Sequence, residues 1–243
     1  MNDWNNINQF GGYSTAVQAE NELTLRRYVS AVMRKVYGKM ALGLLLTAIT
    51  SFFVASSQAV MSLLFSTPAT IWILFAAELG LVIYLSARID KLNAGTATAL
   101  FYLYSAINGV TLAPIFLVYT GTSIATTFAI TAGTFALMSL SGYITKQDLS
   151  KFGSVMMMAL LGLILCIVVN LFLHNAMMDL IISCAGVLIF VGLTAWDTQA
   201  IKRMCEMADP SMQGKIATMG ALTLYLDFIN LFIHLLRLFG SRD

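Results

Sequence analysis

Three carboxylates, Glu78, Asp197 and Asp227, lie inside long apolar stretches of this sequence. The stretch around Asp227 reads "ALTLYLDFINLFIHLLRLFG" over residues 221–240. About 20 such residues, at a rise of 1.5 Å each, cross the hydrocarbon of a bilayer. A charge at that depth costs about 2.5–3.5 kcal/mol on insertion scales, and it commonly marks a functional position. The chemistry open to such carboxylates is proton sharing and the binding of a cation.

Asp197 and Asp227 are expected to lie at a common level. Asp197 lies near the inner end of the sixth apolar segment. Asp227 lies roughly nine residues, or about 13 Å, from the inner end of the seventh, which runs the other way. Two adjacent buried carboxylates hold one proton between them near neutral pH, because both cannot ionise cheaply. When that proton leaves, the two anions attract a divalent cation. Ca²⁺ takes six to eight oxygens, so the two aspartates predict a transient site and not a tight cage.

Polar residues recur on one face of several segments. Thr223, Asp227, Asn230 and His234 are spaced at i, i+4, i+7 and i+11, so all four project from one side of a helix. A polar face on a membrane helix turns to the interior of the bundle, because lipid offers it no partner. His234 is expected to be an interfacial or hydrogen-bonded histidine and not a ligand. The candidates for lining a buried site or pore are Glu78, Tyr104, Asn108, Thr194, Thr223 and Asn230.

Composition defines the class of protein. Soluble domains have about 25% charged and 45–50% apolar residues. This chain of 243 residues has 11% charged and 58% hydrophobic residues, with a mean hydropathy of +0.80. These values predict one polytopic membrane bundle. The net charge of +2 gives no reason to expect nucleic acid as a partner. The three cysteines, Cys166, Cys184 and Cys205, support neither a disulfide framework nor a zinc site.

Seven apolar segments follow a polar N-terminal tail. Residues 1–25 are rich in Asn, Gln and Gly and are expected to be disordered, whereas residues 26–243 form the membrane domain. The predicted spans are 36–56, 69–87, 95–118, 122–144, 153–173, 177–199 and 218–239. The sequence therefore predicts an all-α membrane protein with seven transmembrane helices.

The basic residues predict the orientation of these helices. With a cytoplasmic N-terminus, twelve of the 14 Lys and Arg residues fall on the inner side. They are Arg26, Arg27, Arg34, Lys35, Lys39, Arg88, Lys91, Lys146, Lys151, Lys202, Arg203 and Lys215. Only Arg237 and Arg242 lie at the outer end. Cytoplasmic loops are enriched in Lys and Arg, so we expect the N-terminus inside and the C-terminus outside.

Four motifs resemble those of the transmembrane Bax inhibitor motif family, in its bacterial inner-membrane branch. They read "LTLYLDFINLFIHLLRLFG", "GLTAWDTQAIK", "YSAINGVTLAPIF" and "MALGLLLTAIT", and the resemblance extends from residue 26 onward. It implies seven helices, of which six surround the C-terminal one. It also implies a calcium leak across the membrane.

The same resemblance assigns roles to individual residues. Asp197 and Asp227 match the family's aspartate pair, which senses pH and gates the ion path. Glu78 matches an acidic residue of the second helix. Arg88, in "SARIDK", falls near an arginine that latches onto the aspartates. We expect no cofactor and no catalytic residue, with Ca²⁺ and H⁺ as the permeant or regulatory ions.

The sequence predicts a pH-sensitive calcium leak protein in a bacterial inner membrane, with the lipid bilayer as its surroundings. One alternative is a non-conducting regulator that binds a membrane protease or other membrane proteins. A more remote alternative is an intramembrane aspartyl protease, which also needs two aspartates. Such enzymes carry Gly-x-Gly-Asp at the second aspartate, where this chain reads "TLYLD". The chain is therefore not expected to be an enzyme.

Overall fold

The computed structural model describes the backbone of residues 4–241 and the side chains of residues 20–67 and 69–241. Helices make up nearly all of this part of the chain, and it contains no strand. The helices are α1 (Trp4–Ala55), α2 (Gln58–Phe65), α3 (Pro68–Arg88), α4 (Ala94–Leu112), α5 (Ile115–Val118), α6 (Gly121–Ile144), α7 (Ser150–Leu173), α8 (Ala176–Met207) and α9 (Gln213–Phe239), with a 3-10 turn at Pro210–Met212.

Local sequence signals begin and end these helices. Asn93, Thr120 and Asn175 cap α4, α6 and α8, and the side chain of each accepts a hydrogen bond from a backbone N–H of the first turn. Pro114 separates α4 from α5, since proline lacks the N–H that would continue the helix. Asp209 turns the chain into α9 by accepting from the N–H of Ser211, and this bond lowers the pKa of the Asp209 carboxyl.

Seven of the described helical stretches are long and apolar enough to cross a membrane, and they match the seven predicted segments. They cover Glu20–Ala55, Ala69–Arg88, Ala94–Val118, Gly121–Ile144, Ser150–Leu173, Ala176–Met207 and Pro210–Phe239. The predicted fold class is thereby confirmed. The sixth span is longer than predicted, because α8 continues as a more polar helix beyond residue 199.

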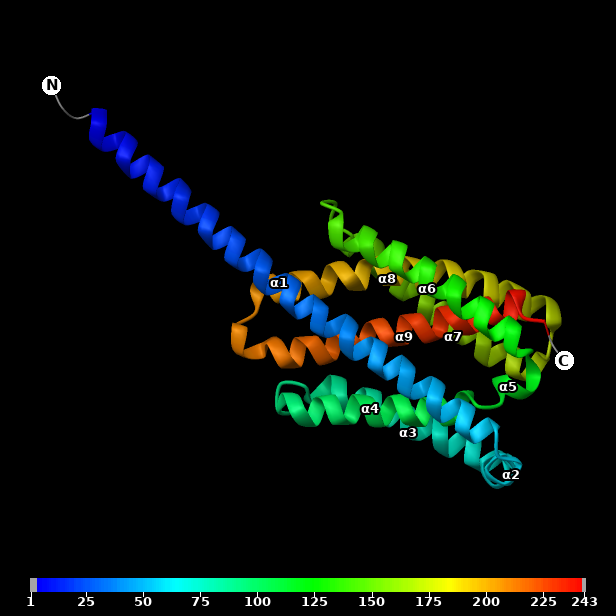
Figure 1. Cartoon of the computed structure of the whole chain (residues 1–243). Helices are drawn as coiled ribbons and strands as arrows, with labels where there is room; N and C mark the ends of the chain where they lie inside the picture. The colour runs from blue at the N-terminus through cyan, green and yellow to red at the C-terminus, as the bar shows by residue number, and fades with distance from the viewer. Residues whose placement is uncertain (1–3, 242–243) are drawn as a thin grey trace.

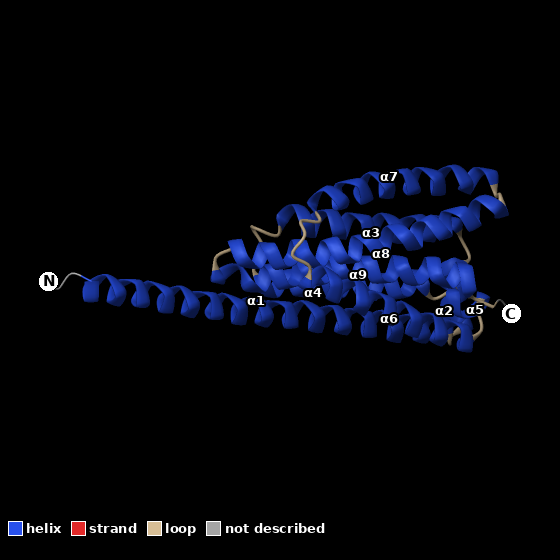
Figure 2. Ribbon diagram, turned by 90° about the horizontal axis from the view of Figure 1, so that it is seen from above, coloured by secondary structure: helices blue, strands red, loops and turns tan. Residues whose placement is uncertain are grey.

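α9 is the central helix of the bundle. In its 18-residue apolar window 72% of the residues are buried, against at most 39% in any other span of the described chain. It packs directly against α1, α4, α6 and α8. Phe228 of α9, for example, meets Phe135 of α6 edge to face at 5.5 Å. α3 packs on α4 and α7 packs on α8, so these two helices form an outer layer (Figure 2).

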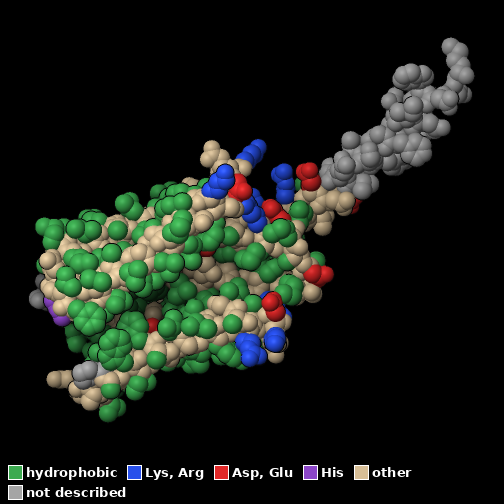
Figure 3. Space-filling view, turned by 180° about the vertical axis from the view of Figure 1, so that it is seen from behind, with side chains coloured by type: hydrophobic (Ala, Val, Ile, Leu, Met, Phe, Trp, Pro, Cys, Tyr) green, Lys and Arg blue, Asp and Glu red, His purple; other side chains and the backbone are tan. Residues whose placement is uncertain are grey.

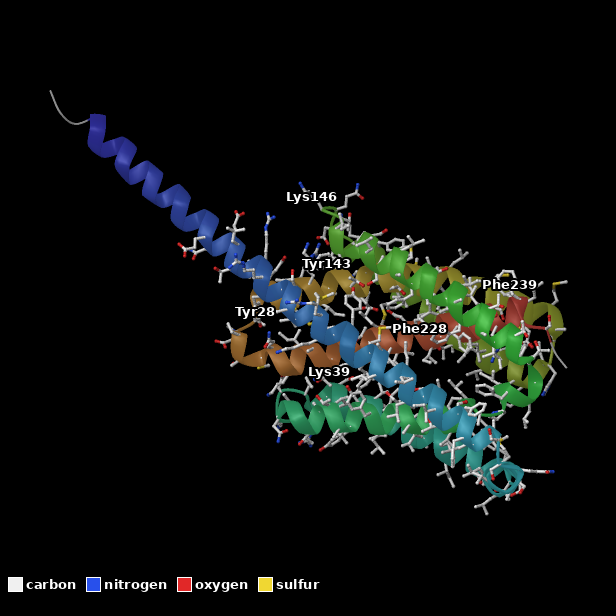
Figure 4. The ribbon with its side chains drawn as sticks, in the orientation of Figure 1. Tyr28, Lys39, Tyr143, Lys146, Phe228 and Phe239 are labelled. Carbon is white, nitrogen blue, oxygen red and sulfur yellow. The ribbon has the colours of Figure 1, made fainter. Side chains whose placement is uncertain are left out.

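The two ends of the bundle differ in charge. Lys and Arg gather at the end from which α1 projects, whereas hydrophobic side chains cover the long sides (Figure 3). Lys146 lies toward this basic end and Phe239 lies at the opposite end (Figure 4). The N-terminal part of α1 extends away from the other helices, and the C-terminus lies at the far end of the bundle (Figure 1).

The predicted tail, residues 1–25, is described only in part. Residues 1–3 lie outside the described residues, and the backbone from Trp4 onward is helical. The predicted boundary at residue 25 is therefore no break in secondary structure. Side chains are described from Glu20, and residues 20–27 are exposed. Disorder of residues 1–25 stays a prediction.

Candidate functional site

α8 and α9 bring Asp197 and Asp227 together. The two helices run in opposite directions and pack along each other. Their carboxyl groups lie within hydrogen-bonding range of one another. A carboxylate only accepts hydrogen bonds, so a bond between two carboxyl groups requires a proton on one of them. The arrangement therefore fits a pair that holds one proton.

Asp227 is the more deeply placed of the two aspartates. Its side chain is 4% exposed, whereas Asp197 is half-buried. Among the described residues, Asp227 Oδ2 has no hydrogen-bond partner. A buried carboxyl oxygen without a partner is costly in a structure, and a site that binds water or an ion is one explanation for it. The free oxygen makes Asp227 the stronger candidate for contact with an ion.

Glu78 adds a third acid from the outer layer of helices. It lies on α3, is 8% exposed, and reaches the side chains of Thr111 and Asn108 on α4. Its Oε1 has no partner within the described chain. No three His, Cys, Asp or Glu residues of the described chain come close enough together to hold a metal ion. The three acids therefore face a common space without forming a closed metal site.

That space is a cavity of about 660 Å³. It is lined by α3, α4, α7, α8 and α9, and a hollow with acidic side chains inside it is visible on this face in Figure 3. Apolar side chains make up most of its wall, including several from α7. The predicted residues that line it are Glu78, Tyr104, Asp197, Thr223, Asp227 and Asn230. We call it the aspartate cavity.

Two predicted lining residues are not part of the wall of the aspartate cavity. Asn108 Oδ1 accepts a hydrogen bond of 3.0 Å from the hydroxyl of Tyr225, in the packing between α4 and α9. The Thr194 hydroxyl donates to the carbonyl of Phe190, one turn earlier in the same helix, at 2.7 Å. Neither lines the aspartate cavity. Both are buried polar groups whose partners come from the protein.

Arg88 lies apart from the aspartates in this structure. It is exposed in the last turn of α3, and it makes no ion pair with any residue that the structure describes. A latch between Arg88 and the aspartate pair stays a prediction, which requires the end of α3 to move.

Comparison with known proteins identifies the family. The model of the family described as inhibitor of apoptosis-promoting Bax1 matches residues 29–243, which include all the residues that line the aspartate cavity. The chain belongs to this family.

Bacterial relatives extend the similarity over most of the chain. The inner membrane protein YbhL of Escherichia coli K12 is 52% identical over 220 residues, which cover 89% of this chain and 94% of that protein. An uncharacterized protein of Borreliella burgdorferi is 44% identical and covers 86% of this chain and 91% of its own length. Protein RP147 of Rickettsia prowazekii, also uncharacterized, is 44% identical, with 90% and 91% covered.

In this member of the Bax1 inhibitor family, the connection between α6 and α7 is fixed to α8. Arg203 pairs with Asp148 at 2.7 Å and also donates to Gln199 Oε1 at 2.9 Å. Gln199 Nε2 donates to the carbonyl of Gln147 at 2.8 Å. Hydrogen bonds from Ser150, together with Arg203, lower the pKa of the Asp148 carboxyl to about 2. These contacts hold the connection against α8 at Gln199, which is two residues beyond Asp197.

Sequence reasoning did not single out Tyr225, and it predicted His234 to be an interfacial or hydrogen-bonded histidine and not a site residue. Tyr225 is fully buried, and its hydroxyl joins Thr47 of α1, at 2.6 Å, to Asn108 of α4. A tyrosine deep in an apolar segment is the available signal, because its hydroxyl needs a partner. His234 lines the aspartate cavity and stacks on Phe190. The spacing of His234 from Asp227 indicates that both lie on the same face of α9. Its neighbours on α8 cannot be read from that spacing.

Proposed function

We propose that this protein is a pH-dependent calcium leak of a bacterial inner membrane, gated by Asp197 and Asp227. The observation that carries the proposal is the pair of carboxyl groups within hydrogen-bonding range of each other, on the wall of a large cavity. With one shared proton the pair carries a single negative charge. Loss of that proton leaves two adjacent anions, which favour a divalent cation. The leak therefore rises as the pH rises.

The oxygen atoms available in the aspartate cavity suit the passage of Ca²⁺ better than its tight binding. Asp227 Oδ2 and Glu78 Oε1 are buried oxygens without a partner in the described chain. Asn230 Nδ2 already donates to the Leu226 carbonyl, which leaves the Asn230 side-chain oxygen for a ligand. Water must complete the coordination shell of Ca²⁺. Weak, partly hydrated binding suits an ion that must also leave.

The proposal includes the orientation and the absence of catalysis. The basic end of the bundle would face the cytoplasm together with the N-terminus, and the C-terminus would lie outside. We infer residence in the inner membrane from the relative YbhL, an inner membrane protein. No enzymatic step is assigned to any residue, and no cofactor is needed.

The decisive experiment is calcium flux into proteoliposomes of the purified protein over a pH series. We expect flux to increase from acidic to neutral pH, because the shared proton leaves over that range. Protein-free liposomes and liposomes with Asp197→Asn protein are the controls. Absence of flux from folded protein at every pH contradicts the proposal.

A second candidate is a regulator that binds other membrane proteins without conducting ions. The observation in its favour is the N-terminal part of α1, which projects beyond the bundle with residues 20–27 exposed (Figure 1). A membrane protease is one class of partner for such a surface. Removal of residues 1–25 separates the candidates, because this surface is lost while the aspartate cavity stays intact. Unchanged flux after this removal supports the leak, whereas loss of protease binding without any flux supports the regulator.

A further inference from the structure

A second cavity lies beside the aspartate cavity, at the end of the bundle where the chain terminates. Its volume is about 390 Å³. Asn170 and His174 of α7, Asp179 of α8 and Arg237 of α9 line it. Asn170 donates to Asp179 Oδ1 at 2.8 Å, so part of the wall is fixed. We call it the end cavity.

Three helices contribute to both cavities. α7, α8 and α9 each contribute side chains to the aspartate cavity and, further along, to the end cavity. Ile167 of α7 lines both of them. On α9, His234 lines the aspartate cavity and Arg237, one turn later, lines the end cavity. The two cavities therefore follow each other along one seam and meet at the level of Ile167 and His234.

His234 narrows this seam. Its ring stacks on Phe190 with centroids 5.8 Å apart, and it lies directly against Gly186 of α8. A Cβ atom at Gly186 would lie 2.5 Å from the imidazole, so only glycine leaves room for the ring. Phe190 and Gly186 are both on α8. The His234 side chain of α9 therefore packs directly against the surface of α8.

The Nδ1 atom of His234 has no role in holding the described fold together. The side chain is 4% exposed, and its Nδ1 has no hydrogen-bond partner among the described residues. A buried ring nitrogen normally has a partner, and such an exception calls for an explanation. Water, or the hydration shell of an ion, would supply that partner if the ring turned away from Gly186.

We propose that the seam between α7, α8 and α9 is the route between the aspartate cavity and the C-terminal surface. His234 against Gly186 is its neck, and the end cavity is its mouth. The route would carry hydrated cations, whose water shell can bond to the imidazole while Phe190 and Ile167 present apolar walls. Narrow apolar constrictions with few polar groups gate conduction in channels. This inference rests on the proposed calcium leak for its ion, but the aqueous route can be tested without calcium.

The first test is thiol labelling in a variant whose native cysteines are replaced. Ile167→Cys is placed on the seam, and the neighbouring Val168→Cys is the matched control on the exposed, lipid-facing side of α7. A membrane-impermeant, water-soluble maleimide added from the C-terminal side should label Ile167→Cys and leave Val168→Cys unlabelled. Equal labelling of the two variants, or labelling of Val168→Cys alone, overturns the route.

The second test is the leak itself. His234→Ala removes the ring from the neck and should raise calcium flux into proteoliposomes several-fold. Leu235→Ala removes a similarly buried side chain from the next position of α9, away from both cavities, and should leave the flux near that of the wild type. Equal increases in both variants mean general loosening of the bundle, and unchanged flux in His234→Ala means no neck.

The two tests separate this inference from the proposed function. Labelling of Ile167→Cys together with absence of calcium flux in the wild type keeps the aqueous route and rejects the leak. Calcium flux in the wild type without labelling of Ile167→Cys keeps the leak and rejects this route.

Discussion

Tyr225 and Asp227 project from nearly opposite sides of the central helix, and the hydroxyl of Tyr225 fixes how that helix is turned. Residues two apart on an α-helix differ by about 200° in direction. The Tyr225 hydroxyl contacts Thr47 at 2.6 Å and donates to Asn108 at 3.0 Å. These bonds hold one side of α9 against α1 and α4. They therefore turn Asp227 toward α8 and the aspartate cavity.

Tyr225→Phe should lower the stability of the bundle. The change removes the hydroxyl and leaves buried polar groups on Thr47 and Asn108 with one partner fewer. Interhelical hydrogen bonds in membrane proteins contribute about 0.6 kcal/mol on average and up to about 1.7 kcal/mol. We expect a loss of about 1 kcal/mol, measured as a lower thermal midpoint in detergent. Tyr84→Phe, at an exposed position on α3, is the control and should match the wild type.

Asp197→Asn and Asp227→Asn should each remove most of the pH dependence of calcium flux. Asparagine keeps the size of the side chain and its hydrogen bonds, but it cannot share a proton. The double variant should add little, because the two groups act as one unit. Flux in proteoliposomes between acidic and neutral pH is the measurement. Variants that fold normally and keep the wild-type pH profile would refute the shared-proton gate and make Asp227 a structural residue.

Arg88→Ala tests the latch. If Arg88 reaches the aspartates in a closed state, its removal should raise the leak at acidic pH, where the wild type is closed. Arg88 is free to move, since it is exposed and makes no ion pair with the described residues. Lys202 and Arg203 are already bound to Tyr143 and Asp148. If the leak at acidic pH is unchanged in Arg88→Ala, then Arg88 is not the latch. Either Lys202 or Arg203 has that role, or there is no latch.

Gly142→Ala should destabilise the contact between α6 and α8. A Cβ atom at Gly142 would collide with the backbone carbonyl of Ala195, which cannot move aside as a side chain can. Overpacking of this kind costs about 1–3 kcal/mol. Gly133→Ala, on the same helix with open space around its Cβ, should be neutral or slightly stabilising, because alanine favours the helix. Thermal unfolding of the two variants is compared; equal midpoints contradict the prediction.

Reporter fusions at the two termini test the orientation. A reporter active only in the cytoplasm should be active at the N-terminus and silent at the C-terminus. A reporter active only outside should give the reverse pattern. Seven candidate spans lead us to expect the two termini on opposite sides, and the basic end of the bundle is the one expected to face the cytoplasm. Cytoplasmic activity at both ends would mean that α9 does not cross the membrane.

Hydropathy and helical period predicted the spans and the faces, because both follow from local sequence. The period of 3.6 residues placed Thr223, Asp227 and Asn230 on one face, and all three line the cavity. The sequence could not predict which side chains line the cavity where contacts between helices decide their positions. Asn108 turns to Tyr225 of another helix, and the Thr194 hydroxyl bonds to its own backbone. Both lie on polar faces, and nothing local distinguishes them from the residues that reach the cavity.

The surroundings of His234 depend on a pairing that sequence spacing does not contain. Gly186 precedes it by 48 positions, and the ring fits only because these two residues face each other across α8 and α9. The extent of α8 was also underestimated. Its apolar part ends near residue 199, but the helix continues to Met207 with Gln199, Lys202 and Arg203 bound to neighbouring elements.

The central position of α9 has a consequence for biosynthesis. α9 leaves the ribosome after all the other described helices, yet it fills the middle of the bundle. Until it is inserted, the polar faces of α1, α4 and α8 have no final partner, and the earlier helices enclose an unfilled centre. Assembly of the bundle is therefore completed only when α9 is inserted. A chain that stops before α9 lacks Asp227, so only chains that include α9 form the aspartate pair.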